Sequence, residues 1–176
     1  MSTIDLRALF HIGYGLYIVA AQSGGRLNGQ IVNTVFQVSA EPPRIAVAIH
    51  KNNLTHQLIS ESGAFSVSVL DTDTPMPFIG TFGFKSGHDV QKFDGVEYKI
   101  GVTGSPIVLA HTLSAMEAKL FGKMDLGTHD LFVADLVAAE CLREGQPLTY
   151  SYYRENKHGK APQNAPTYQA RPAKNR

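Results

Sequence analysis

The stretch Lys51–Thr55 contains the residue types that bind a phosphate group. Lys51 offers a cation, Asn53 is a favourable residue just before a helix, and Thr55 offers a hydroxyl group. Free N–H groups at the first turn of a helix attract anions. The same residues also fit an ordinary capped helix start, and the pattern alone favours that simpler explanation.

Two other stretches carry groups that are useful at a binding site. The first is Phe82–Lys85, with two aromatic rings and a cation, and the second is the turn Asp125–His129, which ends in a histidine. The structural alternatives are a surface loop with two anchoring aromatic residues and a tight turn with an ordinary histidine. Neither stretch identifies a reaction by itself.

Familiar catalytic and metal motifs are missing from the sequence. It contains no dinucleotide-binding glycine fingerprint, no Walker loop, no nucleophile elbow and no CxxC pair. His50 and His56 flank a predicted strand-to-helix turn, where a cap or surface role is a better explanation than a metal site. Cys141 has no neighbouring sequence cue for a lowered pKa, so we expect a structural role. The sequence predicts no metal site.

Most of the segments that must position these groups are predicted strands. The stretch Ile31–Val38 reads as a strand interrupted by polar residues, Pro42 stops the ladder, and Arg44–Ile49 reads as a short buried strand. The other predicted elements are a short helix at 3–11, a strand at 16–21 in a hairpin with the next strand, a helix at 54–60 ending at Gly63, a strand at 64–70, a short helix at 75–82 capped by Thr74, a loop-rich region at 83–110, and strands at 112–120, 131–140 and 148–153. This pattern favours a mainly β protein, a small barrel with a few short helices.

Length and composition limit the possible classes. The chain has 176 residues, which fits one domain at 1–153 followed by an extended, basic, Pro-rich tail at 154–176. A net charge of +1 with mixed signs argues against nucleic-acid binding. The single cysteine fits a reducing compartment, no signal peptide is evident, and no stretch approaches the roughly 20 apolar residues of a membrane span. We therefore expect a cytoplasmic protein without a membrane partner.

Several longer segments, in order and spacing, resemble one family. They are NGQIVNTVFQVSAEPPRIAV, KNNLTH, SGAFSVSVL and DLGTHDLFVADLV, supported by YGLYIVAA, PFIGTFGFKSG, LTYSYY and APTY. Together they resemble the flavin reductase family of FMN-binding split barrels, and within it the flavoredoxin and ferric reductase branch. The resemblance covers residues 5–168 approximately. It implies a six-stranded Greek-key split barrel that forms a homodimer, with FMN near the subunit interface.

The resemblance also implies roles for particular residues of this chain. The flavin ring and ribityl chain would contact Gln30, Ile31, Val32, Asn33, Thr34 and Gln37, the phosphate would contact Lys51, Asn52, Asn53, Leu54 and Thr55, and the flavin would be covered by Phe82, Gly83, Phe84 and Lys85. His129 would lie near the nicotinamide of NAD(P)H as the catalytic residue. Thr128 stands where the usual form of that turn has Asp.

The activity implied by the resemblance is reduction of bound FMN by NAD(P)H, a transient reductant, followed by transfer to an acceptor such as a flavin or a ferric chelate. One alternative is a flavoredoxin-like carrier that exchanges electrons with an iron–sulfur or rubredoxin-type protein. Another is an FMN-binding module without enzymatic activity. In this branch the APTY region can lead into a rubredoxin-like module, and we expect residues Pro162–Tyr168 to pack on the barrel or on its partner.

Overall fold

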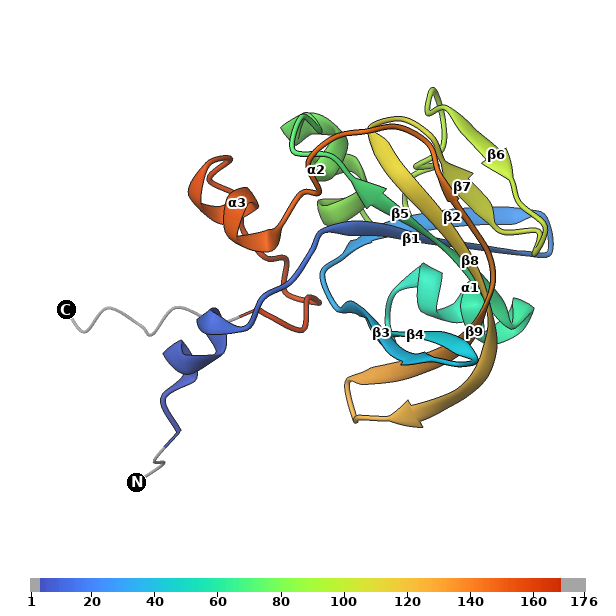
Figure 1. Ribbon diagram of the computed structural model, residues 1–176, viewed down its shortest axis with the longest axis horizontal. Helices are drawn as coiled ribbons and strands as arrows, with labels where there is room; N and C mark the ends of the chain where they lie inside the picture. The colour runs from blue at the N-terminus through green and yellow to red at the C-terminus, as the bar shows by residue number, and fades with distance from the viewer. Residues whose placement is uncertain (1–3, 169–176) are drawn as a thin grey trace.

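A curved antiparallel sheet forms the body of the protein, whose structure is a computed structural model that describes residues 4–168 (Figure 1). The sheet has seven strands in the order β2-β1-β5-β8-β9-β4-β3, and β6 pairs with β7 in a separate small sheet. The elements are η1 (Leu6–His11), β1 (Tyr17–Ser23), β2 (Arg26–Val32), β3 (Val35–Ala40), β4 (Pro43–His50), α1 (Leu54–Ser62), β5 (Ala64–Leu70), α2 (Met76–Phe84), β6 (Tyr98–Ile100), β7 (Pro106–Val108), β8 (Thr112–Asp125), β9 (His129–Cys141) and α3 (Tyr150–Glu155). The mainly β class is therefore confirmed.

Two hydrophobic clusters occupy the two faces of this sheet. One surrounds α1 and includes Val19, Leu58 and Phe65, and the other lies under α2 and includes Ile18 and Phe82. Successive side chains of a strand point to opposite faces, so β1 contributes Ile18 to one cluster and Val19 to the other. Full burial of each such side chain contributes about 1.5–3 kcal/mol. The sheet is thus held to α1 on one face and to α2 on the other.

Short turns set the register of the strand pairs, as the sequence predicted for β1 and β2. Gly24 and Gly25 have φ values of 55° and 77°, which connect β1 to β2. Gly127, with φ of 84°, lies in the turn between β8 and β9. Helix α1 ends at Gly63 in the left-handed conformation with φ of 70°, also as predicted.

The stretch predicted as a single strand from Ile31 to Val38 is instead two strands. β2 ends at Val32 and β3 begins at Val35, so the prediction was wrong at Asn33 and Thr34. These two residues satisfy their polar groups outside a strand ladder, since the Thr34 hydroxyl donates to the backbone oxygen of Ala48 at 3.1 Å. This break adds a strand, and the main sheet has seven strands where six were expected.

The predicted final strand at 148–153 was wrong, because α3 occupies Tyr150–Glu155. The Thr149 hydroxyl accepts a hydrogen bond from the backbone N–H of Tyr152 at 3.2 Å, which caps the helix start. Helix α3 crosses the expected boundary between 153 and 154, so a division at that point cuts through a helix.

Three smaller expectations also differ from the structure. Pro75 rather than Thr74 occupies the N-cap position of α2, without a side-chain capping hydrogen bond. The Thr74 hydroxyl donates instead to the backbone oxygen of Asp71 at 2.6 Å. The loop-rich region at 83–110 contains the β6–β7 hairpin. The predicted helix at 3–11 is a 3-10 helix with no buried residues.

None of the helices within residues 4–168 has the length and apolar character to span a membrane.

Candidate functional site

Four segments that lie far apart in the sequence meet at a groove of about 390 Å³. Strand β2 supplies one wall, the start of α1 another, and the end of α2 with its following loop a third. The fourth segment, from the C-terminal tail, closes one side. We call this the α1–α2 groove, and its lining residues are Gln30, Ile31, Asn52, Asn53, Leu54, Phe82, Gly83, Phe84, Lys85, Ser86, Gly87, His88, Lys92, Pro162, Gln163 and Asn164. The groove therefore brings together residues from the stretches predicted to contact the flavin ring, to bind its phosphate and to cover it, but none from the turn Asp125–His129.

The start of α1 presents unpaired backbone donors to this region. Asn53 is the N-cap residue in an extended conformation, and its side chain makes no capping hydrogen bond. The N–H groups of Leu54 and Thr55 have no hydrogen-bond acceptor within residues 4–168, whereas that of His56 donates to the Asn53 oxygen at 3.0 Å. Free N–H groups at a helix start are suited to an anion.

Two predicted phosphate-binding side chains, those of Lys51 and Thr55, do not line the α1–α2 groove. The Lys51 Nζ lies 2.5 Å from an Asp125 oxygen and 3.6 Å from an Asp130 oxygen. The hydrogen bond to Asp125 raises the pKa of Lys51 despite partial desolvation. The Thr55 hydroxyl is buried and accepts from the Asn28 amide at 2.8 Å. The cation and the hydroxyl predicted for the phosphate are thus already engaged with other residues.

The residues predicted to contact the flavin ring lie along β2 and the turn after it. Gln30 and Ile31 line the α1–α2 groove, and the Gln30 Oε1 atom is buried without a hydrogen-bond partner among the described residues. Gln37 is separate, because it is exposed on β3 and its amide donates to the Ser39 oxygen at 3.1 Å. The structure therefore groups the β2 residues and leaves Gln37 apart.

Beside this groove, the tail covers a narrow crevice of about 50 Å³. Val32 and Asn33 line it on the β2 side. The Asn33 amide donates to the Thr167 hydroxyl at 2.9 Å, and the Asn164 amide donates to the Asn53 side-chain oxygen at 3.0 Å. These contacts confirm that residues Pro162–Tyr168 pack on the barrel.

His129 is the first residue of β9, at the end of the turn that the sequence singled out. Its Nδ1 atom lies 2.9 Å from the Thr128 hydroxyl, and its Nε2 atom lies 3.3 Å from the backbone oxygen of Asn164. The His50 ring packs edge-on against it at 4.9 Å between centroids. His129 lies at the rim of the tail-covered region and does not line the α1–α2 groove.

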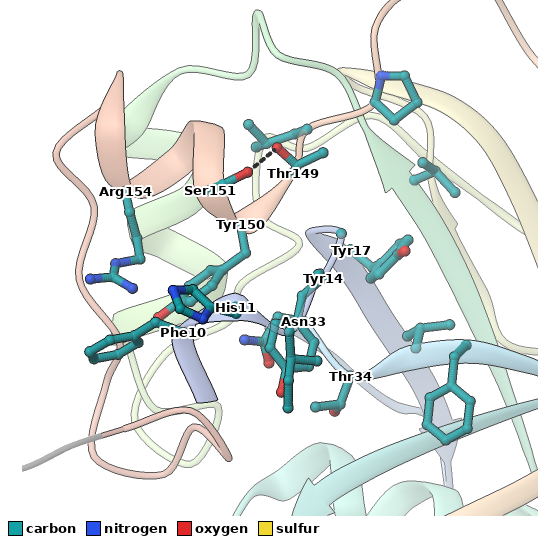
Figure 2. Close-up of a pocket in the computed structure, with 18 of the residues that line it drawn as sticks. Phe10, His11, Tyr14, Tyr17, Asn33, Thr34, Thr149, Tyr150, Ser151 and Arg154 are labelled. Carbon is teal, nitrogen blue, oxygen red and sulfur yellow. Dashed lines mark hydrogen bonds between the residues drawn. The ribbon is translucent and has the colours of Figure 1, made fainter. Parts of the chain in front are cut away.

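A larger hollow of about 1030 Å³ opens on the other side of Asn33 and Thr34 (Figure 2). Tyr14, Tyr17 and Tyr150 project into it, together with Phe10 and Phe36. The Arg154 guanidinium lies over the Phe10 ring at 4.4 Å from its centroid. Burial raises the pKa of Tyr17. We call this space the aromatic hollow, and it is suited to a flat ring system or to a second protein surface.

The sequence analysis missed Lys92, which lines the α1–α2 groove and is only 5% exposed. Its Nζ donates to the Phe82 oxygen at 3.1 Å, and burial lowers its pKa to about 8. It also missed His88, and it expected Asn164 only to pack on the barrel as part of the 162–168 segment, not to line the groove. The one available signal was that long irregular regions such as 83–110 often carry function. Among residues 4–168, no three His, Cys, Asp or Glu side chains are grouped as metal ligands would be.

Comparison with known proteins identifies the family. Residues 9–159 match the model of the flavin reductase like domain. The chain is 51% identical over 165 residues to the ferric-chelate reductase (NAD(P)H) of Archaeoglobus fulgidus, a match that covers 94% of this chain and 98% of that protein. It is 46% identical over 165 residues to the high molecular weight rubredoxin of Moorella thermoacetica, covering 94% of this chain and 72% of that protein.

A solved structure agrees with these sequence matches. The FMN-binding protein from Thermus thermophilus with bound 1-cyclohex-2-enone superposes with a TM-score of 0.70 at 26% identity, and the match covers 80% of this chain and 78% of that chain. The domain match spans most of the sequence, and the first relative is aligned over nearly its full length. This chain belongs to the flavin reductase like family.

Proposed function

We propose that the protein is an FMN-binding, NAD(P)H-dependent reductase that delivers electrons to a flavin or a ferric chelate. The observation that carries this proposal is the α1–α2 groove, where β2, the start of α1 and the end of α2 meet. Family membership and the names of its relatives support the same activity.

The groove fits an FMN molecule on two independent grounds. Among the described residues that line it, the charged side chains are lysines and no carboxylate is present. Leu54, whose N–H group is free within residues 4–168, also lines it, and the free N–H group of Thr55 is the next one in the first turn of the helix. This donor set suits a phosphate dianion. The buried Gln30 Oε1 atom lacks a partner, and an N–H group of a flavin ring would supply one.

Bound FMN would accept a hydride and pass electrons on, so no protein nucleophile is required. The chain's own residues would bind and orient the reactants. Ile31 and Gln30 would hold the ring edge, Asn52–Leu54 would hold the phosphate, and Phe82–Lys85 would cover the flavin. The open aromatic hollow beside Asn33 and Thr34 would give a reactant access to the other side of β2.

His129 would orient the nicotinamide through a hydrogen bond from its imidazole. In the structure its Nε2 atom is already occupied by the Asn164 oxygen. A contact with the nicotinamide therefore requires the tail to move away from this atom. The Thr128 hydroxyl on Nδ1 holds the ring in place while Nε2 exchanges partners.

We also infer a homodimer. β3 lies at one end of the strand order, and two of its apolar side chains, Phe36 and Val38, are 50% and 45% exposed. An unpaired edge strand with exposed apolar side chains is a surface that a second copy of the chain would cover.

The predicted cytoplasmic location is supported by the single exposed thiol, Cys141.

The test of the proposed function is turnover by the purified protein. We expect a yellow protein that retains FMN and oxidises NADH or NADPH when a flavin or ferric chelate is supplied. A colourless protein that gains no FMN on addition of the cofactor would contradict the proposal.

A carrier function is the second candidate, because one close relative is named a high molecular weight rubredoxin. A carrier would exchange electrons with a small iron–sulfur protein and would be reduced slowly by either nicotinamide. Stopped-flow mixing with reduced rubredoxin in one series, and with NADH and NADPH in another, separates the two functions. A module that binds FMN but reacts in neither series would be non-enzymatic.

A further inference from the structure

Lys92 is a buried cation without a counter-ion. It is 5% exposed, and within residues 4–168 no carboxylate lies within 4.0 Å of its Nζ atom. Its single hydrogen bond goes to the Phe82 oxygen at 3.1 Å. Burying an ammonium group is costly unless an opposite charge compensates. The positive charge of the buried Lys92 is therefore not compensated by a negative charge among the described residues.

Lys92 lines the α1–α2 groove together with Asn53 and Leu54 at the start of α1. Two other titratable side chains of the described residues line the same groove, Lys85 and His88, and neither can neutralise it. Burial alone lowers the pKa of Lys92 to about 8, so an anion in the groove would restore its charged form. The described residues that line the groove thus include positively charged side chains and no negatively charged side chain.

Lys51 cannot provide a positive charge to an anion in this groove. Its Nζ atom is held by Asp125 at 2.5 Å and by Asp130 at 3.6 Å, and it does not line the groove. The Lys123 Nζ atom lies 3.4 Å from Asp130 as well, so the charges of the two lysines and the two carboxylates balance within this cluster, and Lys51 is not left free for a phosphate. The cation predicted from the sequence is therefore paired with carboxylates outside the groove.

We propose that Lys92, rather than Lys51, is the counter-ion of the flavin phosphate in the α1–α2 groove. The inference rests on the proposed function. Phe82 lies in the last turn of α2, so the simpler alternative is that Lys92 only caps that helix. A capping lysine would affect stability, but it would not distinguish a phosphorylated flavin from an unphosphorylated one.

The test compares FMN with riboflavin, which share the ring and ribityl chain and differ in the phosphate. We expect Lys92→Met to weaken FMN binding by about 10- to 100-fold, the effect of one charge-assisted hydrogen bond, and to leave riboflavin binding unchanged. Lys119→Met removes the same charge from an exposed position of β8 and should change neither. Binding is measured by quenching of flavin fluorescence, and riboflavin binding shows that each variant is folded.

A second measurement needs no variant. The ratio of the FMN and riboflavin dissociation constants in the wild-type protein should rise by about tenfold between pH 7 and pH 9.5, because the phosphate requires the charged form of Lys92. The same series on Lys92→Met isolates Lys92 from Lys85 and His88, and its ratio should change less. If the Met variant fails to fold, a wild-type ratio that does not rise between pH 7 and pH 9.5 still contradicts the proposal.

Three outcomes would overturn the inference. Equal weakening of FMN and riboflavin in Lys92→Met would show a structural cap. An unchanged FMN affinity would show that another group holds the phosphate. A wild-type protein that binds riboflavin but shows no preference for FMN would also contradict it. A wild-type protein that binds neither flavin would instead refute the proposed function.

Discussion

The Nε2 atom of His129 lies 3.3 Å from the backbone oxygen of Asn164, which belongs to the tail rather than to the barrel. The same tail residue reaches Asn53 through its side chain. A residue proposed for the nicotinamide and a residue proposed for the phosphate are thus joined through one tail residue. Movement of the tail at Asn164 would change both contacts together.

His129→Ala should slow reduction by NAD(P)H by about ten- to a hundredfold, because the imidazole would no longer align the hydride donor. FMN affinity should be nearly unchanged, since His129 does not line the α1–α2 groove. Stopped-flow reduction by NADH and NADPH measures the effect. Variant protein reduced with dithionite should still pass electrons to acceptors at the normal rate, and equal reduction rates at all nicotinamide concentrations would exclude the role.

Loosening the tail should favour nicotinamide binding. Asn164→Ala combined with Thr167→Val removes the side-chain hydrogen bonds to Asn53 and Asn33. If the tail must leave His129 before the nicotinamide binds, a larger open fraction should lower KM by about three- to tenfold. Steady-state kinetics with saturating acceptor measures KM. Gln163→Ala leaves these hydrogen bonds in place and is the control. An unchanged or higher KM in the double variant would contradict the idea that the tail must leave His129 before the nicotinamide binds.

The homodimer should depend on the exposed apolar residues of β3. Phe36→Asp places a charge at a half-exposed position, so it should separate the subunits with little effect on the fold of each. Val102→Asp alters a more exposed apolar residue in the 101–105 loop and should leave assembly unchanged. Sedimentation velocity at micromolar protein concentration distinguishes the two states. A wild-type monomer with FMN bound would contradict the dimer itself.

Lys92 should make the stability of the flavin-free protein depend on pH. Its folded pKa, near 8, is below that of an unfolded lysine, near 10.4, so above pH 8 the unfolded chain binds the proton that the folded chain has released. The free energy of unfolding should therefore rise with pH, by about 1.5 kcal/mol between pH 8 and pH 9.5. Urea unfolding measures it, and the rise should be absent in Lys92→Met. A parallel rise in the variant would assign the effect to other groups.

The sequence predicted strands best where apolar residues alternate regularly along one face of the strand. β5 was found from the alternation of Phe65, Val67 and Val69. The serines between them are buried as well, because Ser66 donates to the Pro106 oxygen at 2.5 Å and Ser68 to the Val108 oxygen at 3.1 Å. Those partners lie in β7, far along the chain. Local alternation therefore identifies the strand but does not reveal what covers it.

The site was predictable only where it depends on residues close together in the sequence. The start of α1 at Leu54 follows from local residue preferences, so the backbone donors were found. The engagement of Lys51 with Asp125 depends on the β8–β9 turn, and the burial of Lys92 depends on the loop after α2 folding against the helix. Charges compensated by residues distant in sequence have no local signature. The family resemblance supplied the location of the site and Lys85, but not the buried cation Lys92.

Strand β1 contributes side chains to both hydrophobic clusters, Val19 to the one around α1 and Ile18 to the one under α2. Neither cluster can lose its packing without disturbing the backbone of the other, so the domain should unfold in one cooperative transition. The α1–α2 groove draws its walls from both helices, α1 and α2. Flavin binding should therefore shift one unfolding transition of the whole domain to a higher melting temperature. The size of this shift is set by the ligand concentration relative to its dissociation constant.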